Sequence, residues 1–242
     1  MRSQDSGWTL ILVAVGIALA GWFVGHGFRV GRASDRFVTV KGVAERNVQA
    51  DVALWPLRFV ATDDDLSRAQ ADIKRSEKEI IAFLDRHGID QTAAQLQGLE
   101  VTDLLANPYR SGPTQSRYII TQTLMVRTQD TERIRLASQD IGELVDAGVV
   151  LSSLGGPGSG PTYLFTKLND LKPEMIAEAT QEARRAAQQF ARDSGSQLGG
   201  IRQASQGVFV ILPRDRAPGI VEEGQLEKTV RVVSTVDYYL ED

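Results

Sequence analysis

The chain contains no cysteine, and this absence excludes whole classes of chemistry. Without thiols the protein has no disulfide, no thiolate metal site, no iron–sulfur cluster and no cysteine nucleophile. Histidine is scarce as well, because the 242 residues hold only His26 and His87. Two histidines far apart in the sequence do not supply the three-ligand sites typical of catalytic zinc. We therefore expect neither a metal nor a cofactor.

An excess of positive charge is also missing, which argues against a nucleic-acid partner. The chain has 27 Lys and Arg against 31 Asp and Glu, so its net charge is −4 and its pI is near 5.4. A nucleic-acid-binding domain usually carries a basic excess instead. Hydrophobic residues make up 42% of the chain and charged residues 24%, values close to those of folded globular proteins. The composition therefore predicts that most of the chain folds.

Catalytic and nucleotide-binding motifs are missing too. The glycine-rich stretch Gly156–Pro161 contains neither G-K-[ST] nor G-x-G-x-x-G, and it leads into a predicted strand instead of a helix. No G-x-S-x-G motif occurs. The run Asp63–Asp65 lacks the EF-hand register, and helix capping explains it. His87 falls in the last turn of a predicted helix, where it suits the helix dipole. We expect no catalytic site.

The amino-terminal segment is the longest apolar run. From Trp8 to Phe28 no residue carries a formal charge apart from a protonated form of His26, and as a helix this run spans about 30 Å, one bilayer crossing. The alternative is a cleaved signal peptide, since Ala18-Leu19-Ala20 is an A-x-A pattern. The apolar run continues beyond that pattern through Val24, which favours an uncleaved anchor. We expect a transmembrane anchor over residues 1–30 and a short linker over 31–36.

Small residues share one face of this predicted helix. They are spaced 4, 3 and 4 residues apart, so two such helices could approach closely in the membrane. The alternative is that Gly and Ala reflect only the usual composition of membrane helices. The candidate packing residues are Ala14, Ala18, Gly21 and Gly25.

The charges that flank the predicted anchor give an orientation. Arg2 precedes it, whereas Arg29, Arg32 and Arg36 follow it. Counted plainly, the positive-inside rule places the large folded part in the cytoplasm.

The rest of the chain alternates pairs of predicted strands with helices. Period-2 and helical patterns give the order ββα ββα ββα ββ, and locally paired strands favour an α+β fold over a doubly wound parallel sheet. The segment Pro213–Gly224 reads as a mobile loop. All five tyrosines fall at predicted strands or turns, so we expect them to pack in the core or on a sheet face and not to bind a ligand. They are Tyr109, Tyr118, Tyr163, Tyr238 and Tyr239. The predicted strands are 37–43, 51–62, 96–105, 118–128, 149–154, 162–168, 202–212 and 226–240, and the predicted helices are 65–88, 130–148 and 171–194.

The third predicted helix carries an alanine-rich stripe that suits close packing on a sheet. Its members are spaced 3, 4, 3 and 4 residues apart. They are Ile176, Ala179, Ala183, Ala186 and Phe190.

Four short motifs make the chain resemble the SIMPL-domain family over residues 37–240. They are Val40-Lys41-Gly42, Ala50-Asp51-Val52-Ala53, Gly88-Ile89, and the alanine-rich helix that runs into Gly195-Ser196-Gln197-Leu198-Gly199. Two departures are Ala44 and Ala50, where the family commonly has Gly and Pro. The resemblance implies one SIMPL-like α+β domain over residues 37–242.

The resemblance also implies a setting and a way of acting. Members are bacterial envelope proteins, secreted or anchored facing the periplasm, without an established activity, and some assemble into large homo-oligomers or are linked to oxidative-stress defence. We therefore expect a single-pass inner-membrane protein with a periplasmic domain, bound to lipid through residues 8–28 and to other copies of itself. The alternatives are an enzymatic or ligand-binding domain with a cleft between hairpins, and a cytoplasm-facing scaffold.

Overall fold

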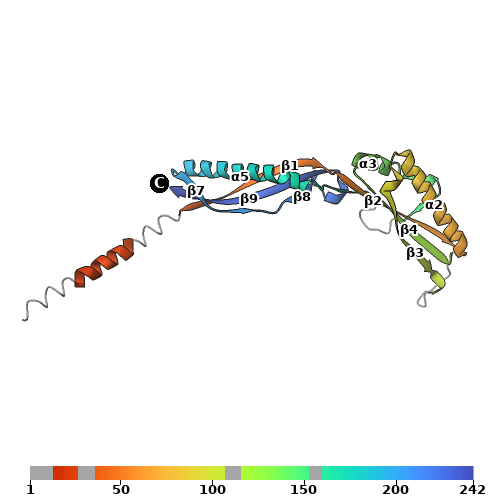
Figure 1. Ribbon diagram of the computed structural model, residues 1–242, viewed down its shortest axis with the longest axis horizontal. Coiled ribbons are helices and arrows are strands. Elements are labelled where there is room, and N and C mark those ends of the chain that lie inside the picture. The colour runs from red at the N-terminus through yellow and green to blue at the C-terminus, as the bar shows by residue number, and fades with distance from the viewer. Residues whose placement is uncertain (1–12, 27–35, 107–115, 153–159, 242) are drawn as a thin grey trace, which may run out of the picture. The chain divides into compact units, whose positions relative to one another are not determined.

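The computed structural model describes residues 13–26, 36–106, 116–152 and 160–241. The chain divides into two compact units, and long elements of the chain contribute residues to both (Figure 1). One unit comprises Met1–Ala44, Glu174–Val208 and Val232–Asp242, and the other comprises Glu45–Pro173 and Phe209–Arg231. The predicted α+β class is confirmed, since helices accompany two antiparallel sheets. Both units draw on the range 37–242 that the sequence predicts as one domain.

A five-stranded antiparallel sheet forms the framework of the second unit. Its strand order is β3-β4-β2-β5, and β6 also pairs with β2. Because β2 alternates buried and half-buried residues, one of its faces belongs to the core. The strands are β2 (Val52–Asp63), β3 (Ala94–Asp103), β4 (Tyr118–Thr128), β5 (Val150–Leu151) and β6 (Thr162–Leu164).

The helix α2 (Leu66–Arg86) covers the core face of this sheet. Asp65 caps it by accepting hydrogen bonds from the backbone N–H groups of Ser67 and Arg68, as the capping prediction for Asp63–Asp65 required. The helix ends at Gly88, whose φ of 70° is left-handed and suits glycine. The core beneath it is built around Trp55, Phe59, Ile80, Phe83 and Leu84.

The second predicted helix is broken in the structure. The segment forms α3 (Thr131–Gln139) and α4 (Gly142–Asp146), so the prediction of one helix over 130–148 was wrong. Asp140 ends α3 by donating its backbone N–H to the Ala137 carbonyl, and the chain restarts at Gly142. The residues Ile134, Ala137 and Leu144 still face the core, which explains why their spacing resembled a single helix.

The crossover at Ala50 and Asp51 carries the chain from β1 (Phe37–Gln49) to β2. The backbone N–H groups of Ala50 and Asp51 donate to the carbonyls of Leu226 and Leu164, each at 2.9 Å. The Asp51 carboxylate accepts the backbone N–H and the hydroxyl of Thr166, both at 2.6 Å. Partial burial alone would raise the pKa of Asp51, but these bonds outweigh it and lower the pKa.

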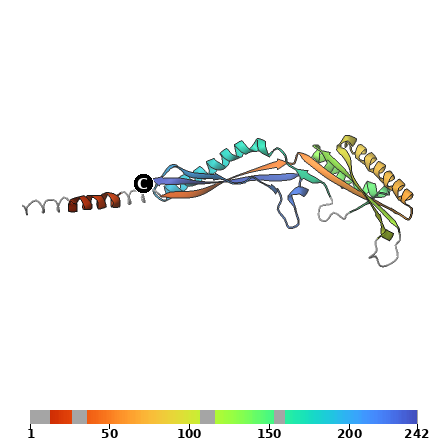
Figure 2. The ribbon, with the colours of Figure 1, turned by 60° about the horizontal axis from the view of Figure 1, so that its bottom comes forward.

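The other sheet has the order β1-β9-β7, with β8 also pairing with β9. Its remaining strands are β7 (Gln197–Gln206), β8 (Val210–Pro213) and β9 (Glu227–Glu241). The helix α5 (Leu168–Asp193) runs along β1 and β9 (Figures 1 and 2). Pro173 lies in its second turn, and because proline has no backbone N–H, one intrahelical hydrogen bond is missing there.

The helix α5 approaches β1 at backbone distance. A Cβ added to Gly42 would lie 1.8 Å from the Ala179 carbonyl oxygen and 2.4 Å from the Ala183 nitrogen. Only a glycine in the strand and small residues in the helix permit this contact. The buried stripe of the helix is Met175, Ala179, Ala183, Ala187 and Ala191.

This stripe differs from the predicted one. Ala179 and Ala183 are buried, but Ile176 is half-buried, Ala186 is exposed and Phe190 is 50% exposed. Placing Ala186 and Phe190 in the contact was wrong, because the contact follows a spacing of four residues and not an alternation of three and four. Ala179 and Ala183 lie against Gly42, and the buried residues four apart continue that row along the helix.

Strand pairing also differs from the predicted hairpins. Two of the four predicted local pairs form: β3 pairs with β4, and the strand segments predicted at 202–212 pair with the one predicted at 226–240. The strands β1 and β2 lie in different sheets, and β5 and β6 each pair with β2 instead of with each other. The predicted strand 202–212 is two strands, β7 and β8, that both pair with β9. Period-2 patterns located the strands but did not specify partners that are distant in sequence.

We predict that Gly42→Ala destabilises the protein by about 3 kcal/mol or more, because the new Cβ collides with backbone atoms of α5 that cannot rotate away. The measurement is urea denaturation followed by circular dichroism. Gly200→Ala in β7 is the matched control, since an added Cβ there meets nothing within 4 Å. Equal midpoints for the two variants would contradict the close contact.

We also predict that Ala183→Leu costs about 1–3 kcal/mol, because it overpacks the buried stripe. Ala186→Leu makes the same change on the exposed side of the same helix and should have little effect. Thermal melts of the two variants distinguish the two stripes. A greater loss for Ala186→Leu would restore the stripe predicted from the sequence.

Candidate functional site

A polar pocket in the second unit is the strongest candidate site. It is a shallow pocket, open to solvent, with a volume of about 460 Å³, within the range of small-molecule pockets. Three segments distant in sequence build it: the end of β1, the first turns of α3, and the segment from the end of β8 to the start of β9. The lining residues are Gln49, Glu132, Arg135, Arg214, Asp215, Gln225, Leu226 and Glu227.

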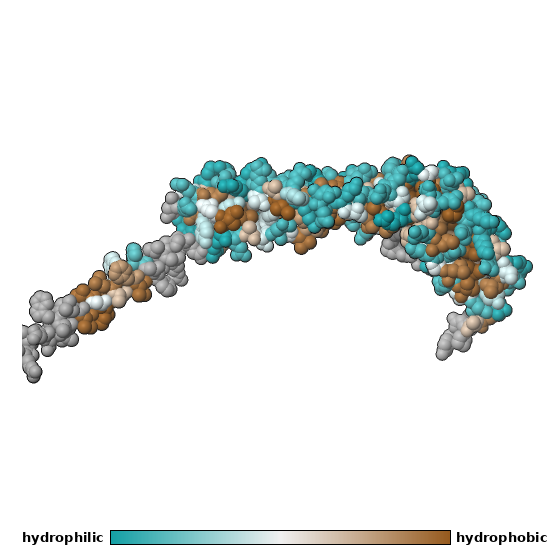
Figure 3. Space-filling view, viewed as in Figure 1, coloured by the Kyte–Doolittle hydropathy of each residue, from teal (hydrophilic) through white to brown (hydrophobic). Residues whose placement is uncertain are grey.

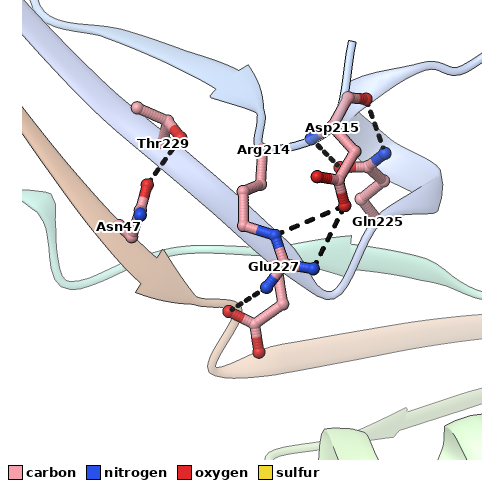
Figure 4. Close-up of polar contacts among 6 residues, drawn as sticks. All are labelled: Asn47, Arg214, Asp215, Gln225, Glu227 and Thr229. Carbon is pink, nitrogen blue, oxygen red and sulfur yellow. Dashed lines mark hydrogen bonds and ion pairs between the residues drawn. The ribbon is translucent and has the colours of Figure 1, made fainter. Parts of the chain in front are cut away.

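Arg214 is one of the two arginines that line the pocket, and Figure 4 shows its ion pairs. Its guanidinium donates to the Asp215 carboxylate, with an Nη2–Oδ2 distance of 3.1 Å, and its Nη1 lies 3.6 Å from Oε2 of Glu227. The bond to Asp215 raises the pKa of Arg214. About half of its side chain is exposed, so the pair is worth little by itself and its partners can be exchanged.

Gln225 fixes the backbone beside Arg214. Its Oε1 accepts the N–H of Asp215 at 3.2 Å, and its Nε2 donates to the Asp215 carbonyl at 2.9 Å. Next to it, Lys228 is fully buried, and its Nζ donates to the Glu222 carbonyl at 2.7 Å and pairs with the Glu222 carboxylate. The segment predicted to be a mobile loop over 213–224 is therefore tied to β9 and contains the short 3₁₀ helix η3 (Glu222–Gly224).

The opposite wall of the pocket carries a second ion pair. Arg135 donates through Nε to Glu132 at 2.9 Å, and this bond lowers the pKa of Glu132. Behind it, burial raises the pKa of the Tyr163 phenol, which also shares a hydrogen bond with Ser138. Ion pairing also raises the pKa of Arg135, so Glu132 and Arg135 are both favoured in their charged forms.

The exposed ion pairs of this pocket suit the reversible binding of a ligand. A general acid at neutral pH needs a carboxyl group whose pKa is raised, and ion pairing moves the pKa of Glu132 the opposite way. Exposed ion pairs can instead open and bind a ligand that carries both signs of charge. In the part of the chain that the structure describes, no three His, Asp or Glu side chains are placed to hold a metal ion.

A second, smaller pocket lies between α2 and the end of β2. It encloses about 270 Å³, and Asp72, Arg75, Ser76 and Glu79 line it from the helix side. Arg75 pairs with Asp72 at 2.8 Å, as expected for residues three apart on one helix. The charged groups of this pocket all lie on α2, whereas those of the first pocket come from distant segments of the chain. It is therefore the weaker candidate site.

Residues that the sequence singled out lie elsewhere. His87 packs against Phe83, with the ring centroids 4.5 Å apart and the rings tilted by 51°, and its Nε2 lies 3.7 Å from Oε1 of Glu143, which places it in the junction of α2 and α4. Tyr163 and Tyr238 are buried. Tyr109 and part of the glycine-rich stretch 156–161 are outside the described residues.

The predicted helix-packing residues lie on the described helix of residues 13–26. Ala14, Ala18, Gly21 and Gly25 are all exposed there. The rest of the predicted anchor, residues 1–12 and 27–30, is outside the described residues. Within the described ranges, no helix is both long enough and apolar enough to cross a membrane.

Sequence reasoning missed the polar pocket because its walls meet only in the folded chain. Arg214 and Asp215 lay in a segment read as a loop, and Gln49 lay between two predicted strands. The one available signal was the cluster of both charge signs around the turn that begins at Pro213. That pattern is common on protein surfaces and is not specific.

The four family-like motifs serve the architecture. Gly42 admits α5, Asp51 holds Thr166 at the start of that helix, and Gly88 and Gly195 end α2 and α5 with left-handed φ values of 70°. After each of these glycines the next backbone N–H bonds back into the helix, from Ile89 to Leu84 and from Ser196 to Ala191.

Comparison with known proteins agrees with this reading of the motifs. The family model SIMPL, described as a protein of unknown function (DUF541), matches residues 38–237. No curated protein matches the chain significantly. The matched range covers most of the 242 residues and includes Gly42, Asp51, Gly88 and Gly195. The chain therefore belongs to the SIMPL family.

Proposed function

We propose that the protein is a membrane-anchored envelope protein that acts without catalysis, through assembly of several copies and through binding. The observation that carries the anchor is the helix of residues 13–26. It has no Asp, Glu, Lys or Arg, and it exposes large apolar side chains to an extent that is unusual in water. These are Val13, Val15, Ile17, Leu19, Trp22, Phe23 and Val24, each at least 50% exposed.

A bilayer is the environment that fits such a helix. The described helix is too short to cross alone, but in the sequence the uncharged run continues on both sides of it, from Trp8 to Phe28. The small residues Ala14, Ala18, Gly21 and Gly25 remain the side on which copies of the helix meet. Family membership supports placing the folded units in the periplasm of a bacterial inner membrane, against the simple count of arginines.

Open sheet edges support assembly by the folded units. Strands with an unpaired edge are ready to pair with another chain, and proteins normally cover or blunt them. In the described sheets, β3, β1 and β7 lie at the ends of the strand orders. Because individual contacts of membrane helices are worth only about 0.6–2 kcal/mol, these edges supply most of the association. A role in envelope or oxidative-stress defence is a further proposal that rests on family membership alone.

The polar pocket supports a second candidate function. Its volume of about 460 Å³ and its exchangeable pairs around Arg214 suit a small ligand that carries both charge signs, such as a zwitterion. A cytoplasm-facing scaffold is a third candidate, which the arginines after the apolar run favour.

We predict that the full chain resists alkaline extraction from membranes. Replacing Ile17 and Leu19 together with arginine should release it, because charged residues at the centre of a span are costly to insert. The same positions changed to alanine serve as the control. A reporter enzyme that works only in the periplasm should be active when it is fused after Asp242. A mature terminus at Gly21, or activity of a cytoplasm-only reporter, would overturn the anchor or the orientation respectively.

We further predict that each particle of the full chain in mild detergent, at micromolar concentration, contains two or more copies of the 26.5 kDa chain once the mass of bound detergent is subtracted. Light scattering coupled to size exclusion measures it. Association follows because sheet edges and membrane helices both offer contacts between copies. A protein–detergent particle with one chain would contradict assembly and would leave ligand binding at the polar pocket as the better function.

A further inference from the structure

The strand β3 has an exposed edge and an apolar surface. It stands at the end of the five-stranded sheet and pairs with β4 on one side. Eight of its ten residues are exposed, and the other two are half-buried. Three aliphatic side chains are among them: Leu96 and Val101 are each 49% exposed and Leu99 is 57% exposed. An edge strand of this length with apolar side chains is open to strand pairing.

A bulge at Gly98 places these three side chains on one face. In regular alternation, Leu96 would point to the face opposite Leu99 and Val101. The register shifts between Gln97 and Leu99, so Leu96, Leu99 and Val101 lie opposite Leu124, Gln122 and Ile120 of β4. Residues directly opposite each other in an antiparallel pair share a face, and Leu124 and Ile120 face the core.

The helix α2 leaves this apolar row uncovered. It packs on β2 and β4, the two strands farther from the edge. The row therefore extends the core face of the sheet beyond the helix (Figure 3). A bulge that brings apolar residues to a solvent-exposed edge does not protect that edge, and the row needs a partner.

The two acids of β3 are already neutralised from within the sheet. Arg58 of β2 lies 3.5 Å from Glu100, and Arg117 donates to Asp103 at 2.9 Å. The hydrogen bond to Arg117 lowers the pKa of Asp103. The remaining polar side chains on the strand, such as Gln95, Gln97 and Thr102, are uncharged. An incoming strand therefore meets no uncompensated charge.

We propose that β3 is the contact with a second copy of this chain, pairing antiparallel with the β3 of that copy to join the two five-stranded sheets. The proposal rests on the assembly proposed above and names its surface. An antiparallel pairing from end to end, Ala94 opposite Asp103, places the centre between Gly98 and Leu99. Leu96 then lies opposite Val101 of the second copy, and Leu99 lies opposite its Gly98.

This register is complementary to itself. The Leu96–Val101 pair occurs twice, and the two Leu99 side chains lie beside each other near the centre, so one apolar row becomes continuous across both copies. Glu100 faces Gln97 of the second copy, and no acid faces another acid. An unrelated extended peptide has no reason to match both the apolar row and the charge pattern, which is why we favour a second copy.

The absence of cysteine in the chain makes the test direct. The single variant Leu99→Cys in the full chain, in mild detergent, is treated with a short bismaleimide, and covalent dimer is measured on a denaturing gel. We expect at least tenfold more dimer than for the control Gln70→Cys, on the exposed side of α2. Equal yields for the two variants would overturn the proposal.

A second variant tests the energy of the contact. Leu99→Lys should weaken association at least tenfold in dilution series, whereas Thr102→Lys, on the other face of the same strand, should weaken it much less. Equal effects of the two lysines would count against the apolar row. If the wild type associates but Leu99→Cys gives no excess dimer, only the β3 contact fails. If the wild type is a monomer, the assembly and the contact fail together.

Discussion

The approach of α5 to β1 constrains most of the first unit. Gly42 has no Cβ, and backbone atoms of Ala179 and Ala183 occupy the space that a Cβ would fill. The helix therefore lies closer to the strand than a side chain at this position would allow. Every fourth residue of the helix must then be small, and four of the five buried stripe residues are alanines. The close backbone contact adds to the packing of a small core cluster. Its buried members are Val38, Ala183, Ala187, Val236 and Tyr238.

The family motifs extend this constraint along the chain. Asp51 binds Thr166 just before α5 begins, so the crossover into β2 and the start of the helix are fixed by one carboxylate. From that crossover, β2 becomes the middle of the five-stranded sheet and leaves β3 at its end. In this chain the family motifs therefore position the scaffold, and β3 stays at an open edge of the five-stranded sheet. That edge supports the proposed assembly.

Local patterns predicted the elements that depend on local interactions. Asp65, the apolar spacing of α2 and Gly88 determined one helix, and the nearby strands β3 and β4 formed the predicted pair. Partners distant in sequence were out of reach, because alternation identifies a strand without naming its neighbour. The stripe of α5 was misplaced for a related reason: alanines occur on several sides of that helix, and only contact with Gly42 decides which are buried. The pocket around Arg214 likewise needs three remote segments to meet.

Residue-resolved hydrogen exchange on the full chain in detergent tests most directly whether the open edge carries the assembly. The backbone N–H groups of β3 that point away from β4 have no partner in the sheet of one copy. If a second copy pairs with β3, these groups exchange as slowly as those of β4, and Leu99→Lys removes their protection. Exchange of the same groups at the rate of unstructured peptide in the assembled wild type would contradict the proposed pairing.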